Sequence, residues 1–361
     1  MKFLLIAGTA LRAMTMTAMA ADKASVVSTY SDIAEAGYGD SLITARTLQS
    51  AVEALITSPS VEGLSAAKAA WLAARVPYQQ TEVFRFGNPI VDDWEGKVNA
   101  WPLDEGLIDY VDVSYGGPTD ENEFAALNVI ANPTLSIGGV DVDATNITSA
   151  LLEGTLHEAD GIEANVATGY HAIEFLLWGQ DLNGHGPGAG ARSWTDYALG
   201  ANCTNGNCDR RGDYLKAAVD LLVSDLEWMT ARWGENGSAR NAITSNPDAG
   251  VIAMVTGMGS LSYGEQAGER MRLGLMLNDP EEEHDCFSDN THNSHFYDGL
   301  GVCNVYNGSY TRIDGSVISG PSLADMVQQS DVGLAAELSG KLDTSVLALG
   351  RIKTAAQAGF A

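Results

Sequence analysis

The chain contains the stretch Gly169-Tyr170-His171-Ala172-Ile173-Glu174-Phe175-Leu176-Leu177-Trp178-Gly179, an apolar run that carries one imidazole and one carboxylate. Its composition predicts a buried helix. His171 and Glu174 are three residues apart, so on a helix they share one face. Buried ionisable groups are costly unless they are hydrogen-bonded, paired or bound to a metal. The pair therefore has two interpretations: two side chains that satisfy each other, or two ligands of a metal site.

The overall composition narrows the classes of function. The chain has 361 residues, which suits two domains of about 150 residues each. Its 47 acidic and 20 basic residues give a formal net charge of -27. This balance argues against nucleic-acid binding, because phosphates are neutralised by Lys and Arg. It favours cations or basic surfaces as partners, although a solvated acidic face would have the same composition.

The first twenty residues are typical of an export signal. Lys2 precedes the apolar run Phe3-Leu4-Leu5-Ile6-Ala7, and the segment ends in Ala18-Met19-Ala20, where we expect cleavage. Export places the mature chain in the periplasm or at the surface of a bacterium. No later run reaches the roughly 18 apolar residues that a membrane span needs, so we expect no transmembrane segment in the mature chain.

The chain has four cysteines, which in an exported protein are most simply two disulfides. We favour local pairing of Cys203 with Cys208 and of Cys286 with Cys303, although three pairings are formally open. A cysteine-based zinc site is disfavoured, because the sequence has no Cys-x-x-Cys.

Apolar residues recur at steps of three and four through most of the chain, which predicts helices. Gly37 and Gly39 are expected to interrupt the first helix, and the region 109–145 is expected to form loops with one small hairpin. The predicted helical segments are 26–56, 61–86, 148–178, 213–233, 251–276, 322–339 and 342–357.

Charged and aromatic residues follow helical spacing along one predicted helix and crowd together in a second group later in the chain. One stripe lies along the second predicted helix, and Pro77 is expected to kink that helix. Its aromatic members indicate that another element covers it, whereas a solvated face is the simpler alternative. The first stripe consists of Trp71, Arg75, Tyr78, Glu82 and Arg85, and the second group contains Tyr263, Glu265 and Arg270.

His292 and His295 form a second candidate site within the expected Cys286–Cys303 loop. Asp289 and Asp298 flank the two histidines. On physical grounds alone, a surface loop held by a disulfide is the favoured interpretation.

The sequence lacks the two zinc-peptidase motifs that a His and Glu pair could belong to. The zincin motif fails because Gly161 stands where the second histidine should follow His157-Glu158, and the inverted motif fails at Phe175. His171 and Glu174 supply two ligands and a metal needs at least one more, for which Glu82 and Asp104 are the candidate carboxylates. Imidazole and carboxylate ligands suit iron or zinc better than copper(I).

Gly169-x-His171-x-x-Glu174 and its surroundings resemble the signature of the imelysin family, in its iron-regulated, exported branch. The resemblance covers nearly the whole mature chain, in blocks that follow the family's order. These are Trp71 to Phe86, Asn99-Ala100-Trp101-Pro102-Leu103-Asp104-Glu105, Asn165 to Gly184, Gly259 to Arg270, and Thr291-His292-Asn293-Ser294-His295.

The resemblance implies an all-α fold of two helical-bundle domains with a site between them. We place the N-terminal bundle at 21–195, with the motif, and the C-terminal bundle at 196–361, with the disulfide loops. It also implies a link to iron acquisition, since some relatives are metal-binding components of iron uptake and others are described as insulin-cleaving metallopeptidases. His171 and Glu174 carry over as the motif pair, with Glu82, Arg75, Asp104 and Arg270 as companions.

We therefore predict an exported protein that binds a transition metal, with iron favoured and zinc the other candidate. Its partners would be the metal ion or an iron chelate, and an iron-uptake component. The first alternative is a metallopeptidase in which Glu174 and Arg75 are catalytic, and the second is a metal-free protein that binds a peptide or a chelate. The predicted metal ligands are His171, Glu174, Glu82 and Asp104, and the predicted substrate-binding residues are Tyr78, Arg85, Tyr263, Glu265, Arg270, His292 and His295.

Overall fold

The computed structural model describes residues 21–120, 122–278 and 280–359. The predicted export signal, residues 1–20, lies outside the described residues. Helices dominate the chain, and the only strands in the described part form two two-stranded antiparallel hairpins. The predicted all-α fold class is confirmed. None of the described helices combines the length and the apolar character that crossing a bilayer requires.

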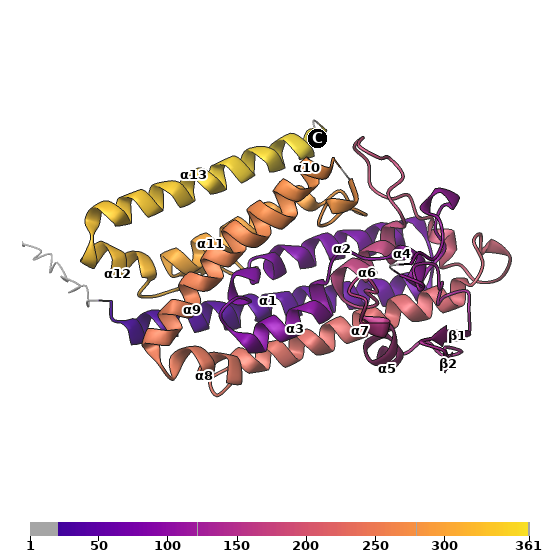
Figure 1. The fold of residues 1–361 in the computed structure, drawn as a ribbon, viewed down its shortest axis with the longest axis horizontal. Helices are drawn as coiled ribbons and strands as arrows, with labels where there is room; N and C mark the ends of the chain where they lie inside the picture. Colours follow the sequence, from indigo (N-terminus) through magenta and orange to yellow (C-terminus); the bar gives the residue numbers. More distant parts are fainter. Residues whose placement is uncertain (1–20, 121, 279, 360–361) are drawn as a thin grey trace, which may run out of the picture.

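The helices and strands follow one another in a simple order along the chain (Figure 1). The first half contains α1 (Lys23–Thr57), α2 (Val61–Gln79), α3 (Pro89–Asn99), α4 (Glu105–Ile108), β1 (Thr134–Ile137), β2 (Val140–Asp143), α5 (Ser149–Leu151) and α6 (Gly169–Trp178). The second half contains α7 (Cys208–Trp233), α8 (Ser238–Thr244), α9 (Pro247–Gly259), α10 (Gly274–Leu277), α11 (Thr291–Asn307), β3 (Ser309–Thr311), β4 (Val317–Ser319), α12 (Leu323–Ser330) and α13 (Val332–Gln357).

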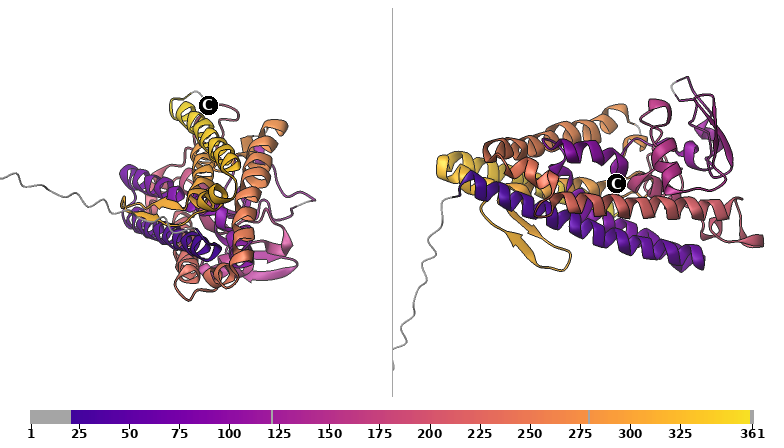
Figure 2. Two further views of the ribbon diagram at one scale, coloured as in Figure 1. Left: turned by 90° about the vertical axis from the view of Figure 1, so that its left-hand side faces the viewer. Right: turned by 90° about the horizontal axis from the view of Figure 1, so that it is seen from below.

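The long helices α1 and α7 run side by side along the molecule, with α2 packed against α1 (Figures 1 and 2). Asp22 starts α1 by accepting a hydrogen bond from the Ser25 N–H, as an N-cap residue should. The helix continues unbroken through 35 residues, so the predicted interruption at Gly37 and Gly39 is wrong. A Cβ at Gly37 would lie 3.0 Å from the Thr81 side chain, which shows that this glycine permits close packing.

The stripe helix α2 runs through Pro77 and ends two residues later, at Gln79. A short 3₁₀ helix, η1 (Glu82–Phe84), follows it. Proline removes one backbone donor, and the chain leaves α-helical geometry within one turn of it. The stripe is covered as predicted, because Trp71, Arg75 and Tyr78 are all buried.

All ten residues of α6 are buried, which agrees with its largely apolar sequence. The helix begins at Gly169, where φ is 78° and a Cβ would lie 2.4 Å from the Val98 carbonyl oxygen. The predicted continuous helix 148–178 is broken before this point. Glu158 and Asp160 adopt positive φ, so the chain arrives at α6 through irregular backbone.

In the second half of the chain, α7 packs against both α1 and α6. The stretch predicted as helix 251–276 is α9, a π-helical segment η7 (Ser260–Leu273) and α10. α11 packs against α2, and α13 packs along the outside of α11 (Figure 1). One continuous hydrophobic core draws residues from both sides of position 195. The division of the chain at that position stays a prediction.

One of the two predicted disulfides is present. Cys203 and Cys208 are bonded, with a Cα–Cα distance of 6.0 Å. The predicted bond between Cys286 and Cys303 is wrong, because their sulfur atoms are not joined in a disulfide. The expected loop between them is mostly the helix α11, and Cys303 lies twelve residues into it. At about 1.5 Å per residue, this places Cys303 about 18 Å beyond the start of the helix, whereas Cys286 precedes it.

Candidate metal centre

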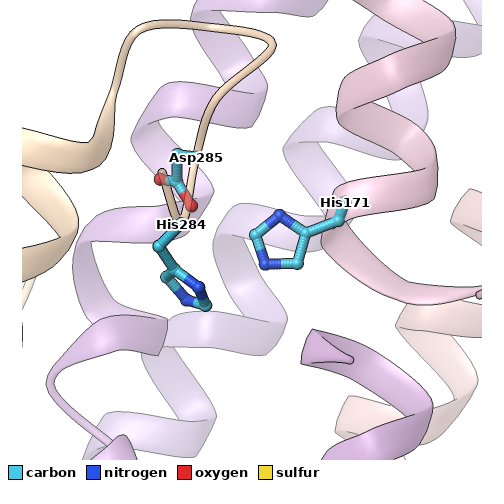
Figure 3. Close-up of side chains that lie close together, drawn as sticks. All are labelled: His171, His284 and Asp285. Carbon is cyan, nitrogen blue, oxygen red and sulfur yellow. The ribbon is translucent and has the colours of Figure 1, made fainter. Parts of the chain in front are cut away.

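Three buried side chains converge between α6 and the segment that precedes α11 (Figure 3). His171 extends from α6 toward His284 and Asp285, and one ligand atom from each lies within 4.8 Å of the other two. Among residues 21–120, 122–278 and 280–359, this is the only group of three potential ligands from His, Cys, Asp or Glu that comes this close. We call it the His171 centre.

The His171 side chain is held by Glu174, as its spacing predicts. The distance from His171 Nδ1 to Glu174 Oε2 is 3.1 Å, and the backbone N–H and hydroxyl of Ser288 donate to Glu174 Oε1 at 2.9 and 2.6 Å. When Nδ1–H donates to Glu174, the lone pair lies on Nε2. That Nε2 atom is buried and has no hydrogen-bond partner.

His284 is buried, and neither of its ring nitrogens has a hydrogen-bond partner. Its ring lies beside the His171 ring, with centroids 4.7 Å apart, and beside the Trp101 ring at 6.4 Å. A buried polar atom without a partner costs about 1 to 3 kcal/mol. An imidazole kept in such a place therefore indicates a ligand that the protein itself does not supply.

Asp285 is fixed from several directions. Arg75 donates to both carboxylate oxygens, at 2.6 and 3.3 Å, while Asn290 and Ser294 donate to Oδ2 at 2.7 and 2.5 Å. The remaining amine of Arg75 donates to Asn99 at 2.7 Å. Because these bonds hold the carboxylate in one orientation, Asp285 is positioned before any ligand binds.

The electrostatics give each group the protonation state that a metal ligand requires. Burial and the nearby Arg75 charge lower the pKa of His171 to about 3, and burial and the charge of Arg270 lower the pKa of His284 well below its usual value. Although burial opposes it, Arg75 lowers the pKa of Asp285 to about 2. Two neutral imidazoles and one carboxylate are thus present at neutral pH.

Glu174 differs from Asp285 in its charge. Burial and the charge of Asp285 raise the pKa of Glu174 well above its usual value. Since the pKa of His171 is lowered at the same time, the short contact between these two residues is a hydrogen bond and not an ion pair. Ser288 donates to Oε1, so the acid proton of Glu174 lies on Oε2 and is donated to His171 Nδ1. A cation at Nε2 would require Glu174 to lose this proton, after which Nδ1–H donates to Glu174 and the carboxylate orients the imidazole.

The donor set fits a transition metal. Two imidazole nitrogens and one carboxylate oxygen are the ligands of many Fe²⁺ sites and of catalytic Zn²⁺ sites. The residues that would hold the ion are His171, His284 and Asp285, with Glu174, Ser288 and Arg75 behind them.

Glu82, predicted as a ligand, lies in a neighbouring buried ion-pair network. Arg270 donates to Glu82 at 2.8 Å and to Asp298 at 3.0 Å. Burial raises the pKa of Asp298 to about 8. Glu82 is therefore occupied by a cationic side chain.

Asp104, the other predicted carboxylate, lies at the start of α4 and accepts hydrogen bonds from Tyr115 and Asn122. The structure does not bring it together with His171 in the group of candidate ligands described above.

The predicted substrate-binding residues are scattered. Tyr78 is buried, with its ring centroid 4.7 Å from that of Tyr170, whereas Tyr263 is 86% exposed. His295 lies on α11, and its Nδ1 atom is buried without a partner. The remaining four have polar neighbours. Arg85 contacts Asp92, Glu95 and Glu265, and Arg270 contacts Glu265 as well as Glu82 and Asp298. His292 contacts Asn293.

His284 and Asp285 are the residues that sequence reasoning missed. They follow three glutamates in a polar segment without helical periodicity. The only local signal is a histidine directly before an aspartate, and that pair is too common to identify a site.

A second buried charged cluster lies between α4, α7 and the segment that follows α6. Arg211 donates to both oxygens of Asp109, at 2.6 and 2.9 Å, and Arg192 donates to Asp109 at 2.7 Å and to Asp196 at 3.2 Å. We call these four residues the Asp109 cluster. The charges of its two positive and two negative side chains cancel.

Comparisons with known proteins agree with this fold. The family model described as Imelysin (Peptidase_M75) matches residues 34–361. A protein named iron-regulated protein A, from Synechococcus elongatus, is 36% identical over 61 residues, which are 17% of this chain and 17% of that protein. The crystal structure of a protein described as an iron-regulated protein A precursor, from Parabacteroides distasonis, is similar in fold. Its TM-score is 0.64 at 17% identity, over 96% of this chain and 94% of that one.

Proposed function

This chain belongs to the imelysin family, and on that premise we propose that it binds a transition-metal ion through His171, His284 and Asp285. We further propose that the ion is iron, that the protein is exported through residues 1–20, and that it takes part in iron acquisition. The names of the two iron-regulated relatives support the link to iron. Zn²⁺ is the other ion that the donor set suits.

One observation carries this proposal. Three imidazole nitrogens, His171 Nε2 and both nitrogens of His284, are buried without a hydrogen-bond partner next to an ionised carboxylate. A bound cation would satisfy one nitrogen of each ring and would offset the charge of Asp285. Hydrogen bonding between His171 and Glu174 alone would leave all three nitrogens unsatisfied.

The contacts of the two predicted catalytic residues favour binding over peptide hydrolysis. A metallopeptidase needs a free general base and a group that stabilises a developing oxyanion. Glu174 is hydrogen-bonded to His171 and Ser288, and Arg75 is hydrogen-bonded to Asp285 and Asn99. Neither side chain is free for these roles in this structure.

Metal analysis of protein purified without chelators tests the proposal. We expect about one equivalent of iron or zinc, and a loss of affinity of at least about tenfold in His171→Ala and in His284→Leu. His185→Ala is the matched control, because His185 is exposed. Anaerobic titration with Fe²⁺ and a parallel titration with Zn²⁺ would rank the two ions. Wild-type protein without stoichiometric metal, or a His284→Leu variant that binds as tightly as wild type, would contradict the proposal.

A further inference from the structure

Trp101 lies beside the two imidazoles of the His171 centre and reaches the protein surface. Its ring centroid is 5.1 Å from that of His171, 6.4 Å from that of His284 and 6.1 Å from that of Phe287. Trp101 is partly exposed, whereas those three residues are exposed by only 0, 2 and 1%. The indole therefore covers both imidazoles while part of its own surface stays in contact with water.

The backbone that carries Trp101 is held on both sides of it. The Asn99 side chain accepts a hydrogen bond from Arg75 at 2.7 Å, and the Asp104 N–H donates to the Ala164 carbonyl at 2.9 Å. The residues between these two anchors belong to no helix or strand. This short segment can therefore change shape without breaking the hydrogen bonds of α3 or α4.

The space at the His171 centre is small. One ligand atom from each of its three residues lies within 4.8 Å of the other two, which is the spacing of ligands around a single ion. The rings of Trp101 and His284 flank the His171 ring, and Glu174 occupies its Nδ1 atom. Because the ligand residues are almost fully buried, a chelator still attached to the ion has no open space beside them.

We propose that Trp101 is the access gate of the His171 centre and admits a metal ion only after the ion has lost its chelator. This inference rests on the proposed metal centre. The indole moves aside to let the ion pass and then packs against the ligand rings again. An indole N–H is a donor only, so Trp101 supplies no ligand atom. It therefore sets the rates of binding and release, whereas the three ligand residues set the affinity.

Chemical labelling of the metal-free full chain tests the gate without a metal. Diethyl pyrocarbonate modifies neutral imidazole nitrogens that it can reach, and mass spectrometry gives the labelling rate at each histidine. In Trp101→Ala we expect His171 and His284 to be labelled at least about tenfold faster than in wild type, because their cover is lost. His185 is exposed and should be labelled at the same rate in both proteins.

Two further variants make the labelling result specific. Trp228→Ala is the matched control, because Trp228 is a tryptophan on α7 that is 41% exposed, and its loss should leave both labelling rates as in wild type. Trp101→Leu keeps a smaller apolar side chain and replaces Trp101→Ala if the circular dichroism spectrum shows that the alanine variant is unfolded. Wild-type labelling rates of His171 and His284 in a folded Trp101 variant would show that the gate is wrong.

Metal exchange tests the choice between free ion and chelate. Transfer of the ion to a chromogenic chelator should be at least about fivefold faster in Trp101→Ala, with the Kd changed less than about threefold, because binding and release cross the same barrier. Wild-type protein dialysed anaerobically against Fe²⁺ and radiolabelled citrate should retain iron without citrate. Retention of one citrate per iron, or an unchanged release rate in the variant, would overturn the gate. If wild-type protein binds no ion, the metal proposal fails, and the labelling rates still decide whether Trp101 covers the imidazoles.

Discussion

The Asp109 cluster and the His171 centre are equally buried, and they use their polar atoms differently. In the Asp109 cluster, two arginines and two aspartates neutralise one another, and only the Nε donor of Arg192 is without a partner. In the His171 centre, three ring nitrogens from two neutral imidazoles have no hydrogen-bond partner and lie near a fixed carboxylate. Burial of charge alone therefore does not identify a binding site. A binding site is indicated instead by ligand atoms that have no partner and converge on one point.

The largest expected effect comes from breaking the balanced cluster. Asp109→Ala would leave Arg192 and Arg211 buried with half of their partners, and we expect the free energy of unfolding to fall by about 3 to 5 kcal/mol. His284→Leu removes unsatisfied polar atoms at similar volume, so metal-free protein should change little in stability. Urea unfolding of metal-free protein measures both, with the exposed Asp112→Ala as the control. Equal losses in the two variants would erase the distinction between the clusters.

Metal addition should raise the free energy of unfolding only when the His171 centre is intact. An ion at about one hundred times its Kd should raise the free energy of unfolding by about 2.7 kcal/mol in wild-type protein. The same increment should appear in a mild variant of the other cluster, such as Asp196→Asn, and should fall to about 1.4 kcal/mol or less in His284→Leu, where the site is at least tenfold weaker. Thermal or urea unfolding with and without the ion provides the measurement. An increment that is undiminished in His284→Leu would place the ion elsewhere.

The residues behind the ligands should have a smaller effect. Glu174→Gln keeps the shape of the side chain but weakens its hold on His171, and we expect metal affinity to fall about tenfold. That factor corresponds to about 1.4 kcal/mol. Competition with a chromogenic chelator measures the affinity. An unchanged affinity together with an unchanged fold would show that Glu174 does not orient His171.

The smallest effect concerns Asp225, a partly buried carboxylate on α7 outside both clusters. Its pKa is raised from 3.8 to about 7 in the folded chain, so the folded state binds more protons than the unfolded state between these values. Stability should therefore fall as pH rises through this window. Asp225→Asn removes the effect and should be more stable than wild type by about 1 kcal/mol at pH 8, with little difference at pH 4. Urea unfolding at both pH values tests this, and an opposite sign would contradict the assigned burial.

Local pattern was enough to predict much of the fold. The core face of α7, with Leu215, Leu222 and Leu226, follows from its spacing, and all three are buried as expected. The Gly138-Gly139 turn joins the predicted hairpin between β1 and β2. These features depend on residues that are close in sequence, where period and turn chemistry are informative.

The features that could not be predicted depend on contacts between residues that are distant in sequence. The contact between His171 and Glu174 could be predicted from an interval of three residues, but His284 lies more than one hundred positions further along the chain. Nothing in the local sequence of an acidic segment indicates which buried helix it will meet. The same holds for Cys303, which lies within the observed helix α11 and forms no disulfide with Cys286.

The two sides of the His171 centre come from residues 171 and 284–285, so the segment 172–283 forms one long loop between them. An ion held by both sides would act as a reversible crosslink that closes this loop. Crosslinks of such span restrict the denatured ensemble by up to about 4 to 5 kcal/mol in the chain-entropy description. Loss of the ion would then make local unfolding easier, and proteolysis faster, across α7 to α10 as well as at the two histidines.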